Sequence, residues 1–448
     1  MNKENRTMLT DLYQLTMNAT YFDSGKNDPA TFDLFIRKLP KDWGYFIANG
    51  IEDAIDYATN INFEADDIAY LEGLEYFKSE YLDFLNEFKF TGEIYAVKEG
   101  TPMPANTPLV RITGPRTEAQ LIETALLNTI NFQTMIATKA NRVVQAAGNA
   151  LIADFGLRRA QEKDAGMKGT RACYIAGVGA TSNVLAGKEY GIPVTGTHAH
   201  SLVMTYPTEL EAFKEYTKSF PDNSTLLIDT YDTIQGARNA IIIAKELERK
   251  GKKLGAVRID SGNLADLSKQ VRTILDKANL PYVKIIASND LNEYKIYDLK
   301  QEGAKIDGYG VGTEMITAKP VAAIPGVYKI VEDENGAKIK LSADKKTYPG
   351  KKQVYRVEQD GKFVEDILAL EGEKVEGKPL LEKIVENGKR IIQRRELNEI
   401  RDYCLKQVAK MPDNTKDVYA TPYEMRPSQK LDGLVRRLTS KYKQEVKK

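Results

Sequence analysis

The segment Gly255-Ala-Val-Arg-Ile-Asp260-Ser-Gly262 decides the fold of this chain. Its short apolar run predicts a buried strand, and the acidic and small residues after it predict a turn into a helix. The same design recurs at Leu151–Phe155, Leu226–Asp229, Val283–Asp290 and Ile306–Thr313. Mostly apolar strands that alternate with helices indicate an α/β fold with a parallel sheet buried on both faces.

Polar residues follow the strands of this series, at Asp229-Thr230, Asp260-Ser-Gly262, Ser288-Asn-Asp290 and Gly310-Val-Gly-Thr313. In a closed parallel barrel such strand ends converge at one mouth, where barrel enzymes place their chemistry. One acidic residue at a strand end is usually a helix cap. Four polar ends in series, together with Thr197-His-Ala-His-Ser201, favour a single site.

His198 and His200 are the only two histidines in the chain of 448 residues. They follow Ile192–Thr195, which predicts a short buried strand. A His-x-His pair can bind a metal, but a metal site usually needs further ligands, and Cys173 and Cys404 stand far apart in the sequence. The other interpretations are two polar residues satisfied by local hydrogen bonds, and a nucleophilic or acid–base histidine. The residues alone leave all three open.

The bulk composition narrows the class of protein. Lys plus Arg number 64 and Asp plus Glu 63, and this balance argues against a partner that is a nucleic acid or a membrane surface. The first residues lack the apolar core of a signal sequence, and no apolar run is long enough to span a membrane. Two cysteines exclude a disulfide framework. We expect a cytoplasmic protein whose partners are small molecules.

The remaining patterns predict three domains, over residues 1–116, 117–330 and 331–448. In the first, we expect a helix at Thr10–Met17, a strand at Thr31–Arg37 and a strand pair at Gly92–Val97 and Thr107–Thr113. One or two helices should cover residues 117–147, at the start of the second. In the third, we expect hairpin turns at Asp333–Gly336 and Gln359–Gly361, a solvated loop at Lys345–Lys352, and a helix from about Glu396.

A ligand with phosphates would suit the mouth of the barrel. The glycines of Gly310–Thr313 let backbone amides approach a phosphate closely. Arg258 lies two residues before Asp260 and so shares its face of the strand. It could neutralise phosphate charge, as could Arg158 or Arg159. Asp260 and Asp290 could hold sugar hydroxyls, magnesium or a developing cation. Such a mixture of charges favours a phosphorylated sugar.

Seven motifs in order, across residues 8 to about 360, resemble nicotinate phosphoribosyltransferase. They are Thr10–Met17, Asp154–Gln161, Gly196–Ser201, Ile228–Thr233, Arg258–Gly262, Ala287–Asp290 and Tyr348–Tyr355. The resemblance implies a type II phosphoribosyltransferase with an N-terminal α/β sandwich, an irregular seven-stranded parallel (β/α) barrel and a small C-terminal domain.

The resemblance also implies an activity. The family joins nicotinate to 5-phosphoribosyl 1-diphosphate in NAD salvage, giving nicotinate mononucleotide and diphosphate, and couples this transfer to ATP hydrolysis through a phosphohistidine. ATP and Mg²⁺ are therefore expected, with Mg²⁺ carried by the substrate rather than by dedicated protein ligands. Zinc is not expected, since Cys404 is the only cysteine beyond Cys173. A homodimer is implied, with Tyr13 entering the neighbouring site.

The motif matches carry residue roles. His200, as the phosphorylated residue, and Asp229 and Asp260 would be catalytic. Substrate-binding residues would be Tyr13, Phe155, Arg158, Asn183, Thr197, Arg258, Ser288, Asn289, Asp290, Gly310, Gly312 and Thr313. By the resemblance, Phe155 stacks on the pyridine ring, the arginines meet the phosphates and substrate, Asp260 and Asp290 face the ribose, and Gly310, Gly312 and Thr313 cradle the 5-phosphate.

Asn183 bears on the choice between nicotinate and nicotinamide. Nicotinamide-using relatives carry an Asp at this place, which accepts from the amide, whereas Asn can donate to a carboxylate. Alternatively, Asn183 merely bonds the backbone at a helix start. Three other functions stay open: a nicotinamide-using phosphoribosyltransferase, a barrel metal-dependent hydrolase, which predicts histidines at later strand ends, and a binding protein without turnover.

Overall fold

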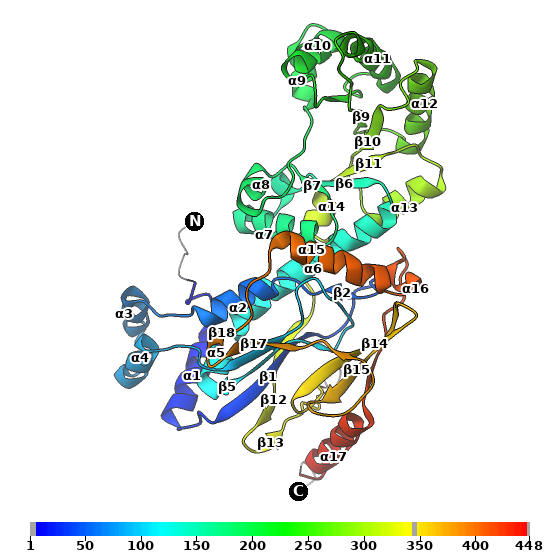
Figure 1. Cartoon of the computed structure of the whole chain (residues 1–448). Coiled ribbons are helices and arrows are strands. Elements are labelled where there is room, and N and C mark those ends of the chain that lie inside the picture. The colour runs from blue at the N-terminus through cyan, green and yellow to red at the C-terminus, as the bar shows by residue number, and fades with distance from the viewer. Residues whose placement is uncertain (1–5, 343–346, 446–448) are drawn as a thin grey trace. The chain divides into compact units, whose positions relative to one another are not determined.

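The structure, a computed structural model, describes residues 6–342 and 347–445. The chain forms two compact units, one of residues 1–135 with 323–448 (unit 1) and one of residues 136–322 (unit 2) (Figure 1). The long helix α6 (Glu123–Ala147) carries the chain from the first into the second.

Unit 2 is built on a parallel sheet in the order β7-β6-β11-β10-β9-β8. Its strands are β6 (Leu151–Asp154), β7 (Ala180–Thr181), β8 (Thr225–Leu227), β9 (Ala256–Ile259), β10 (Lys284–Ala287) and β11 (Gly308–Val311). This confirms the α/β fold with a parallel sheet. A parallel bridge from Thr181 to Val194 adds a seventh position beside β7. The buried strand expected at Ile192–Thr195 is wrong, because only this bridge forms and Val194 is 52% exposed.

Four of the helices that follow strands begin at a polar side-chain cap. Side chains of Asn183, Asp232, Asn263 and Asn292 accept backbone N–H groups at the starts of α8 (Val184–Tyr190), α11 (Thr233–Arg249), α12 (Leu264–Lys277) and α13 (Glu293–Gln301). The other helices of unit 2 are α7 (Glu162–Ile175), α9 (His200–Thr205), α10 (Glu209–Ser219), α14 (Thr313–Ile316) and the 3₁₀ turn η1 (Leu157–Arg159). Polar residues therefore gather at the carboxyl edge of the sheet.

Unit 1 is built on a seven-stranded sheet in the order β13-β12-β1-β5-β3-β17-β18. The strands are β1 (Pro29–Ile36), β3 (Glu93–Ala96), β5 (Pro108–Pro115), β12 (Gly326–Asp333), β13 (Gly336–Ala337), β17 (Glu382–Glu386) and β18 (Lys389–Arg390). The strand expected at Thr31–Arg37 and the antiparallel pairing of β3 with β5 are confirmed. Strands from beyond residue 325 thus share one sheet with strands from the start of the chain.

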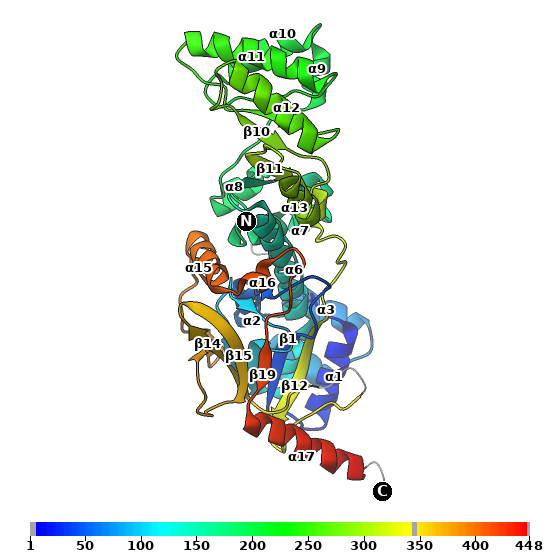
Figure 2. The same ribbon diagram turned by 90° about the vertical axis from the view of Figure 1, so that its right-hand side faces the viewer.

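Helices and two smaller sheets complete unit 1. The helices are α1 (Leu12–Asp23), α2 (Ile51–Thr59), α3 (Ala65–Gly73), α4 (Ser79–Asn86), α5 (Arg116–Leu121), α15 (Leu397–Lys410), α16 (Asp413–Lys416) and α17 (Gln429–Glu445). β14 (Lys352–Gln359), β15 (Lys362–Leu370), β16 (Lys378–Pro379) and β19 (Met425–Pro427) form a four-stranded sheet, and β2 (Phe46–Ile47) pairs with β4 (Pro102–Met103). Helix α17 lies against β15, as Figure 2 shows. The expected helices and hairpin turns are confirmed.

The solvated loop expected at Lys345–Lys352 is wrong for the part that the structure describes, and residues 345 and 346 lie outside it. Lys352 is 2% exposed, its ammonium lies 2.8 Å from Asp33 of β1, and it donates to the carbonyls of Tyr348 and Gly350. Arg111 of β5 donates to the Lys352 carbonyl at 2.7 Å. The ion pair with Asp33 joins residues more than three hundred positions apart, so no local pattern reveals it.

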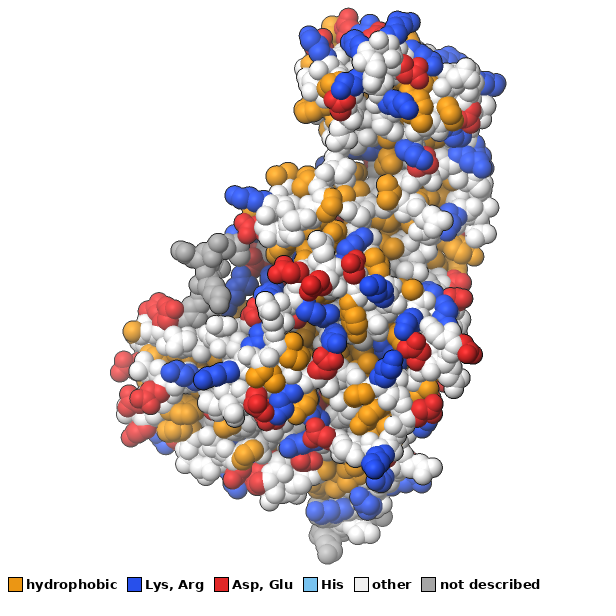
Figure 3. Space-filling model, viewed as in Figure 1, with side chains coloured by type: hydrophobic (Ala, Val, Ile, Leu, Met, Phe, Trp, Pro, Cys, Tyr) orange, Lys and Arg blue, Asp and Glu red, His pale blue; other side chains and the backbone are white. Residues whose placement is uncertain are grey.

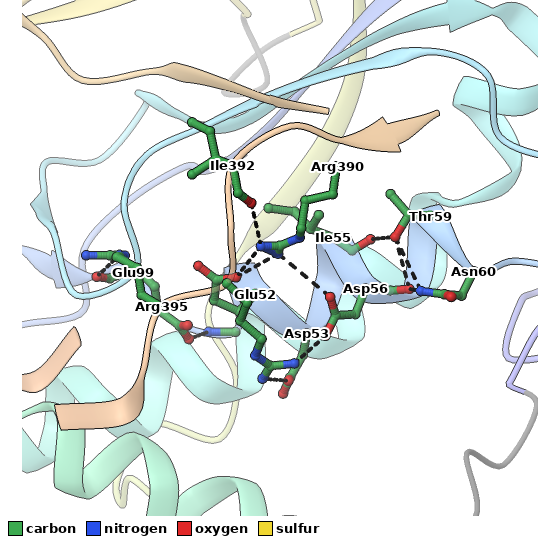
Figure 4. Close-up of polar contacts among 12 residues, drawn as sticks. Glu52, Asp53, Ile55, Asp56, Thr59, Asn60, Glu99, Arg390, Ile392 and Arg395 are labelled. Carbon is green, nitrogen blue, oxygen red and sulfur yellow. Dashed lines mark hydrogen bonds and ion pairs between the residues drawn. The ribbon is translucent and has the colours of Figure 1, made fainter. Parts of the chain in front are cut away.

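The end of β18 and the segment after it also contact the first part of the chain, through a group of charged side chains (Figure 4). Arg390 forms an ion pair with Glu52 of α2 at 2.7 Å. Arg395, further along the chain, donates to the backbone carbonyl of Glu99 at 3.0 Å. Burial raises the pKa of Glu52, although Arg390 opposes the shift. These contacts join the two separate stretches of unit 1.

In the face shown in Figure 3, Lys and Arg side chains alternate with Asp and Glu side chains over both units. Within residues 6–342 and 347–445, no helix combines the length and the apolar character needed to cross a bilayer.

Candidate active site

The register of the parallel sheet aligns the polar strand ends. Ile286 of β10 pairs with Arg258 of β9 on one side and with Gly308 of β11 on the other. Two residues further along each strand, Asp260, Ser288 and Gly310 therefore form a row across the carboxyl edge. The pairing of the strands alone therefore brings these three positions together, as the sequence predicted.

Asp260 is the centre of this row. The Ser288 hydroxyl donates to its Oδ1 at 2.5 Å. Its Oδ2 lies 3.7 Å from Nε2 of His200 and 3.6 Å from a guanidinium nitrogen of Arg258. The Asp260 side chain is 32% exposed, so this carboxylate lies between an imidazole and a cationic guanidinium and still reaches solvent. A carboxylate in that position can stabilise positive charge on a bound substrate.

Asp229 lies directly beside Asp260. Its Oδ2 accepts the Asp260 backbone N–H at 2.8 Å and the Ser261 hydroxyl at 2.7 Å. Its Oδ1 is buried and has no hydrogen-bond partner among the described residues. Oxygen ligands of this kind suit Mg²⁺, which proteins often hold with one or two carboxylates while a substrate phosphate supplies the rest. Asp229 and Asp260 are therefore the residues of this edge that fit Mg²⁺.

The two histidines differ sharply in their surroundings. His200 begins α9, its side chain is 38% exposed, and its Nδ1 lies 3.1 Å from the Thr230 hydroxyl. His198 is 7% exposed, and its Nε2 accepts the backbone N–H of Leu227 at 3.1 Å. Burial lowers the pKa of the His198 imidazole. His200 is thus the accessible imidazole at the strand ends.

Both ring nitrogens of His198 are in use. Nε2 accepts from Leu227, so Nδ1 carries the hydrogen and donates to the Ala199 carbonyl at 3.3 Å. The ring also packs on Tyr216 with 4.8 Å between centroids. The interpretation of local hydrogen bonding therefore holds for His198, and the His-x-His metal pair is wrong in this structure because His198 presents no free nitrogen.

Phe155 reaches across the sheet from the end of β6. Its ring lies 6.0 Å from the Arg258 guanidinium, and a Cβ placed on Gly310 would lie 2.5 Å from two of its ring carbons. Gly310 is therefore required by the aromatic ring that lies over it. Arg258 also donates to the Thr197 hydroxyl at 2.5 Å. An aromatic face, a guanidinium and a hydroxyl thus adjoin Asp260.

Asp154 holds the turn that presents Phe155. It is 1% exposed, accepts the Gly156 N–H at 2.8 Å, and accepts the hydroxyls of Thr170 and Thr181 at 2.9 Å each. Burial raises the pKa of this carboxyl. Asp154 is not among the site residues predicted from the sequence. The signal was its position in the series of strand-end aspartates.

Asn183 bonds the backbone at the start of a helix, which was the alternative to a role in binding nicotinate. Its Oδ1 accepts the Ala186 N–H at 3.1 Å as the cap of α8, and the side chain is buried. Its amide nitrogen has only long contacts, 3.4 Å to the Thr170 hydroxyl, 3.5 Å to the Gly166 carbonyl and 3.7 Å to the Met167 sulfur. The oxygen of the Asn183 side chain therefore caps the helix, whereas its N–H groups make only weak hydrogen bonds.

The remaining predicted residues lie at neighbouring strand ends. Asn289 and Asp290 follow Ser288, are exposed, and have φ angles of 109° and 43°, conformations that cost non-glycine residues free energy. Gly312 and Thr313 lie at the start of α14. Arg158, in η1, is exposed. Tyr13 belongs to unit 1, on α1, where 47% of it is exposed, and is not placed relative to these residues.

Thr230 and Ser261 also contact the row, at His200 and Asp229 respectively. Each follows a strand-end aspartate directly, which is the pattern that could have revealed them. Among the described residues, no group of three or more His, Cys, Asp or Glu side chains could hold a metal ion.

A parallel sheet whose carboxyl edge carries acidic, cationic, imidazole and aromatic groups is typical of α/β domains that bind charged small molecules at that edge. Family models agree with this class. Residues 8–131 match the nicotinate phosphoribosyltransferase N-terminal domain, residues 150–329 match the nicotinate phosphoribosyltransferase family, and residues 373–435 match the nicotinate phosphoribosyltransferase C-terminal domain.

Individual relatives extend over most of the chain. A nicotinate phosphoribosyltransferase of Mycobacterium tuberculosis is 40% identical over 417 residues, which cover 93% of this chain and 90% of the relative. That of Bacillus subtilis is 46% identical over 356 residues, covering 78% and 72%. The crystal structure of human nicotinic acid phosphoribosyltransferase superposes with a TM-score of 0.84 at 26% identity, covering 96% and 99%. This chain belongs to the nicotinate phosphoribosyltransferase family.

Proposed function

We propose that this protein is a nicotinate phosphoribosyltransferase of NAD salvage. It joins nicotinate to 5-phosphoribosyl 1-diphosphate and releases diphosphate and nicotinate mononucleotide. Family membership supports the reaction. The observation that carries the finer mechanism is the position of His200, an accessible imidazole 3.7 Å from Asp260 in the row of strand ends.

The transfer step exchanges one bond at C1 of the ribose for another. The bond from C1 to the diphosphate oxygen breaks, its electron pair leaves with the diphosphate, and the pyridine nitrogen forms the new bond. Positive charge that develops on the ribose is stabilised by Asp260 and Asp290. Arg258 and Arg158 bind the negative phosphates and the nicotinate carboxylate. Mg²⁺, when bound, neutralises charge on the diphosphate.

Different residues of the carboxyl edge bind the two substrates. Phe155 stacks on the pyridine ring, and Thr197 keeps Arg258 in place through the hydrogen bond at 2.5 Å. The 5-phosphate lies against the backbone of Gly310, Gly312 and Thr313. Ser288 and Asn289 hold the ribose hydroxyls beside Asp260. Asp229, whose buried Oδ1 has no hydrogen-bond partner among the described residues, and Asp260 would hold the Mg²⁺ that the diphosphate carries.

ATP hydrolysis is coupled to this transfer through His200. In the proposed tautomer the hydrogen is on Nδ1, which lies 3.1 Å from the Thr230 hydroxyl and would donate to it, and Nε2 carries the lone pair that acts as the nucleophile. Nε2 bonds to the γ-phosphorus of ATP while the bond to the bridging oxygen breaks and ADP leaves. Water later hydrolyses the phosphohistidine. The 38% exposure of this ring supports access by a nucleotide.

The assembly and the compartment belong to the same proposal. Leu9, Leu12 and Tyr13 are 42%, 48% and 47% exposed, an apolar group at the start of the chain that supports a homodimer in which Tyr13 enters the neighbouring site. Cys173 and Cys404 are free and buried, as expected of a protein of the reducing cytoplasm.

A direct assay tests the function. Purified protein is mixed with labelled nicotinate, 5-phosphoribosyl 1-diphosphate, Mg²⁺ and ATP, and a parallel reaction contains labelled nicotinamide. We expect nicotinate mononucleotide as the product, faster turnover with ATP than without it, and little product from nicotinamide. Efficient use of nicotinamide alone would favour the nicotinamide-using alternative, and no product from either would reject the proposal.

A further inference from the structure

A buried charged group underlies the carboxyl edge of unit 2. Lys139 and Arg142 project from α6 toward Glu293, the first residue of α13. The Lys139 ammonium lies 2.5 Å from Oε2 of Glu293, and Arg142 Nε lies 3.1 Å from Oε1. Lys139 and Glu293 are each 1% exposed, so neither side chain contacts substrate from solution. Figures 1 and 2 show α6 and α13 near each other.

Glu293 lies three residues after Asp290, at the end of a strained turn. Asn289 and Asp290 have positive φ angles, and such conformations persist only where the surrounding structure holds both ends of the segment. One end is held at Ser288, which is 4% exposed and bonds Asp260. The other end is held at the buried Leu291 and by the two cations on Glu293.

The residue before Glu293 also contacts a second loop, the one that follows β11. Asn292, which caps α13, donates from its amide to Oε2 of Glu314 at 3.3 Å. Glu314 belongs to α14, directly after the Gly310–Thr313 segment. The carboxylate of Glu314 is also close enough to Lys139 to interact with it electrostatically. The loops after β10 and β11 are therefore attached to one buried anchor.

We propose that Glu293, bound by Lys139 and Arg142, is a positioning residue for phosphoribosyl binding. The anchor keeps Asn289 and Asp290 in their strained conformation and so places the Asp290 carboxylate at the ribose. This inference rests on the proposed function for the identity of the substrate. It predicts that the anchor affects affinity for 5-phosphoribosyl 1-diphosphate beyond any effect on stability.

The test compares Glu293→Asp with a control variant at another buried ion pair. Glu293→Asp keeps the negative charge that compensates Lys139, yet withdraws the carboxylate by one methylene, so the anchor moves without leaving an unpaired buried charge. The control is Asp33→Asn in unit 1, where Asp33 and Lys352 form another buried pair at 2.8 Å. Asp33 takes no part in the proposed site.

We expect Glu293→Asp to raise the KM for 5-phosphoribosyl 1-diphosphate about ten-fold or more, since small displacements of site residues are costly, with less change in the KM for nicotinate. Amide hydrogen exchange over residues 288–292 should accelerate in this variant, a readout that needs no activity. Asp33→Asn should lower Tm and leave both the KM and that exchange unchanged.

The proposal is overturned if Glu293→Asp lowers Tm as the control does and leaves the KM and the exchange of residues 288–292 unaltered. Glu293→Gln gives a second measurement with the charge removed, and it should accelerate the same exchange. An inactive parent enzyme would reject the proposed function, whereas the exchange result would still decide whether Glu293 holds the turn.

Discussion

His198 offers a prediction whose size follows from the structure. Its Nε2 accepts the buried N–H of Leu227, and its ring packs on Tyr216. His198→Phe keeps an aromatic ring but removes the acceptor. A buried donor without a partner costs about 1–3 kcal/mol. For a unit of this size each kcal/mol lowers Tm by about 2–4 °C.

The same histidine makes stability depend on pH. Burial lowers the pKa of His198 in the folded protein, whereas in the unfolded chain it titrates near about 6.5. As the pH falls through that value, the unfolded chain takes up a proton that the folded protein does not, so stability decreases on acidification. From pH 7.5 to pH 5.5 the loss is at most about 1.4 kcal/mol for this single proton.

Calorimetric unfolding at several pH values between those limits measures both effects. Because the chain has only two histidines, His200→Ala is a matched control that leaves His198 as the one imidazole. We expect His200→Ala to retain a loss of stability on acidification and His198→Phe to lose that contribution. The reasoning is refuted if His198→Phe is as stable as the parent protein and weakens on acidification just as steeply.

Further predictions concern the proposed reaction. His200→Ala should abolish the phosphoprotein and the stimulation by ATP while slow ATP-independent transfer remains; phosphate still incorporated from labelled ATP would contradict the assignment. Asp290→Ala should weaken binding of 5-phosphoribosyl 1-diphosphate by about ten-fold, measured as KM, and unchanged kinetics would remove this residue from the site. Asn183→Asp retains the cap of α8, since both residues cap well, and should shift preference from nicotinate toward nicotinamide; an unaltered ratio would place selection elsewhere. Gly310→Ala should displace the Phe155 ring and raise the KM for nicotinate about ten-fold, because the added Cβ would lie 2.5 Å from ring carbons; an unchanged KM would separate that ring from nicotinate binding.

The residues at the strand ends were largely predictable from local sequence patterns. Asp229, Asp260 and Ser288 were predicted to lie together because parallel strands of similar length place their ends in one row, and the register confirms it. Family motifs added the roles of individual residues, which stay predictions until tested. Ile192–Thr195 was the exception, because β-branched composition does not supply the neighbouring strand that a ladder requires.

Other contacts depended on partners far away in the sequence. Lys352 lies in a charged stretch, so its pattern indicated a solvated loop, but Asp33 offers a buried carboxylate 2.8 Å away. Asn183 could donate or accept by its chemistry, and only the start of α8 shows that its oxygen is taken by a backbone amide.

The amino-acid sequence by itself determined the alternation of strands and helices, the polar carboxyl edge and the family. These depend on periodicity, caps and motifs, which are local. Only the tertiary structure distinguished the buried ring of His198 from the accessible ring of His200, because the two imidazoles differ only in their surroundings. It also buried Lys139 and Glu293 beneath the strained turn, because a pair so distant in sequence meets only when α6 and α13 pack together.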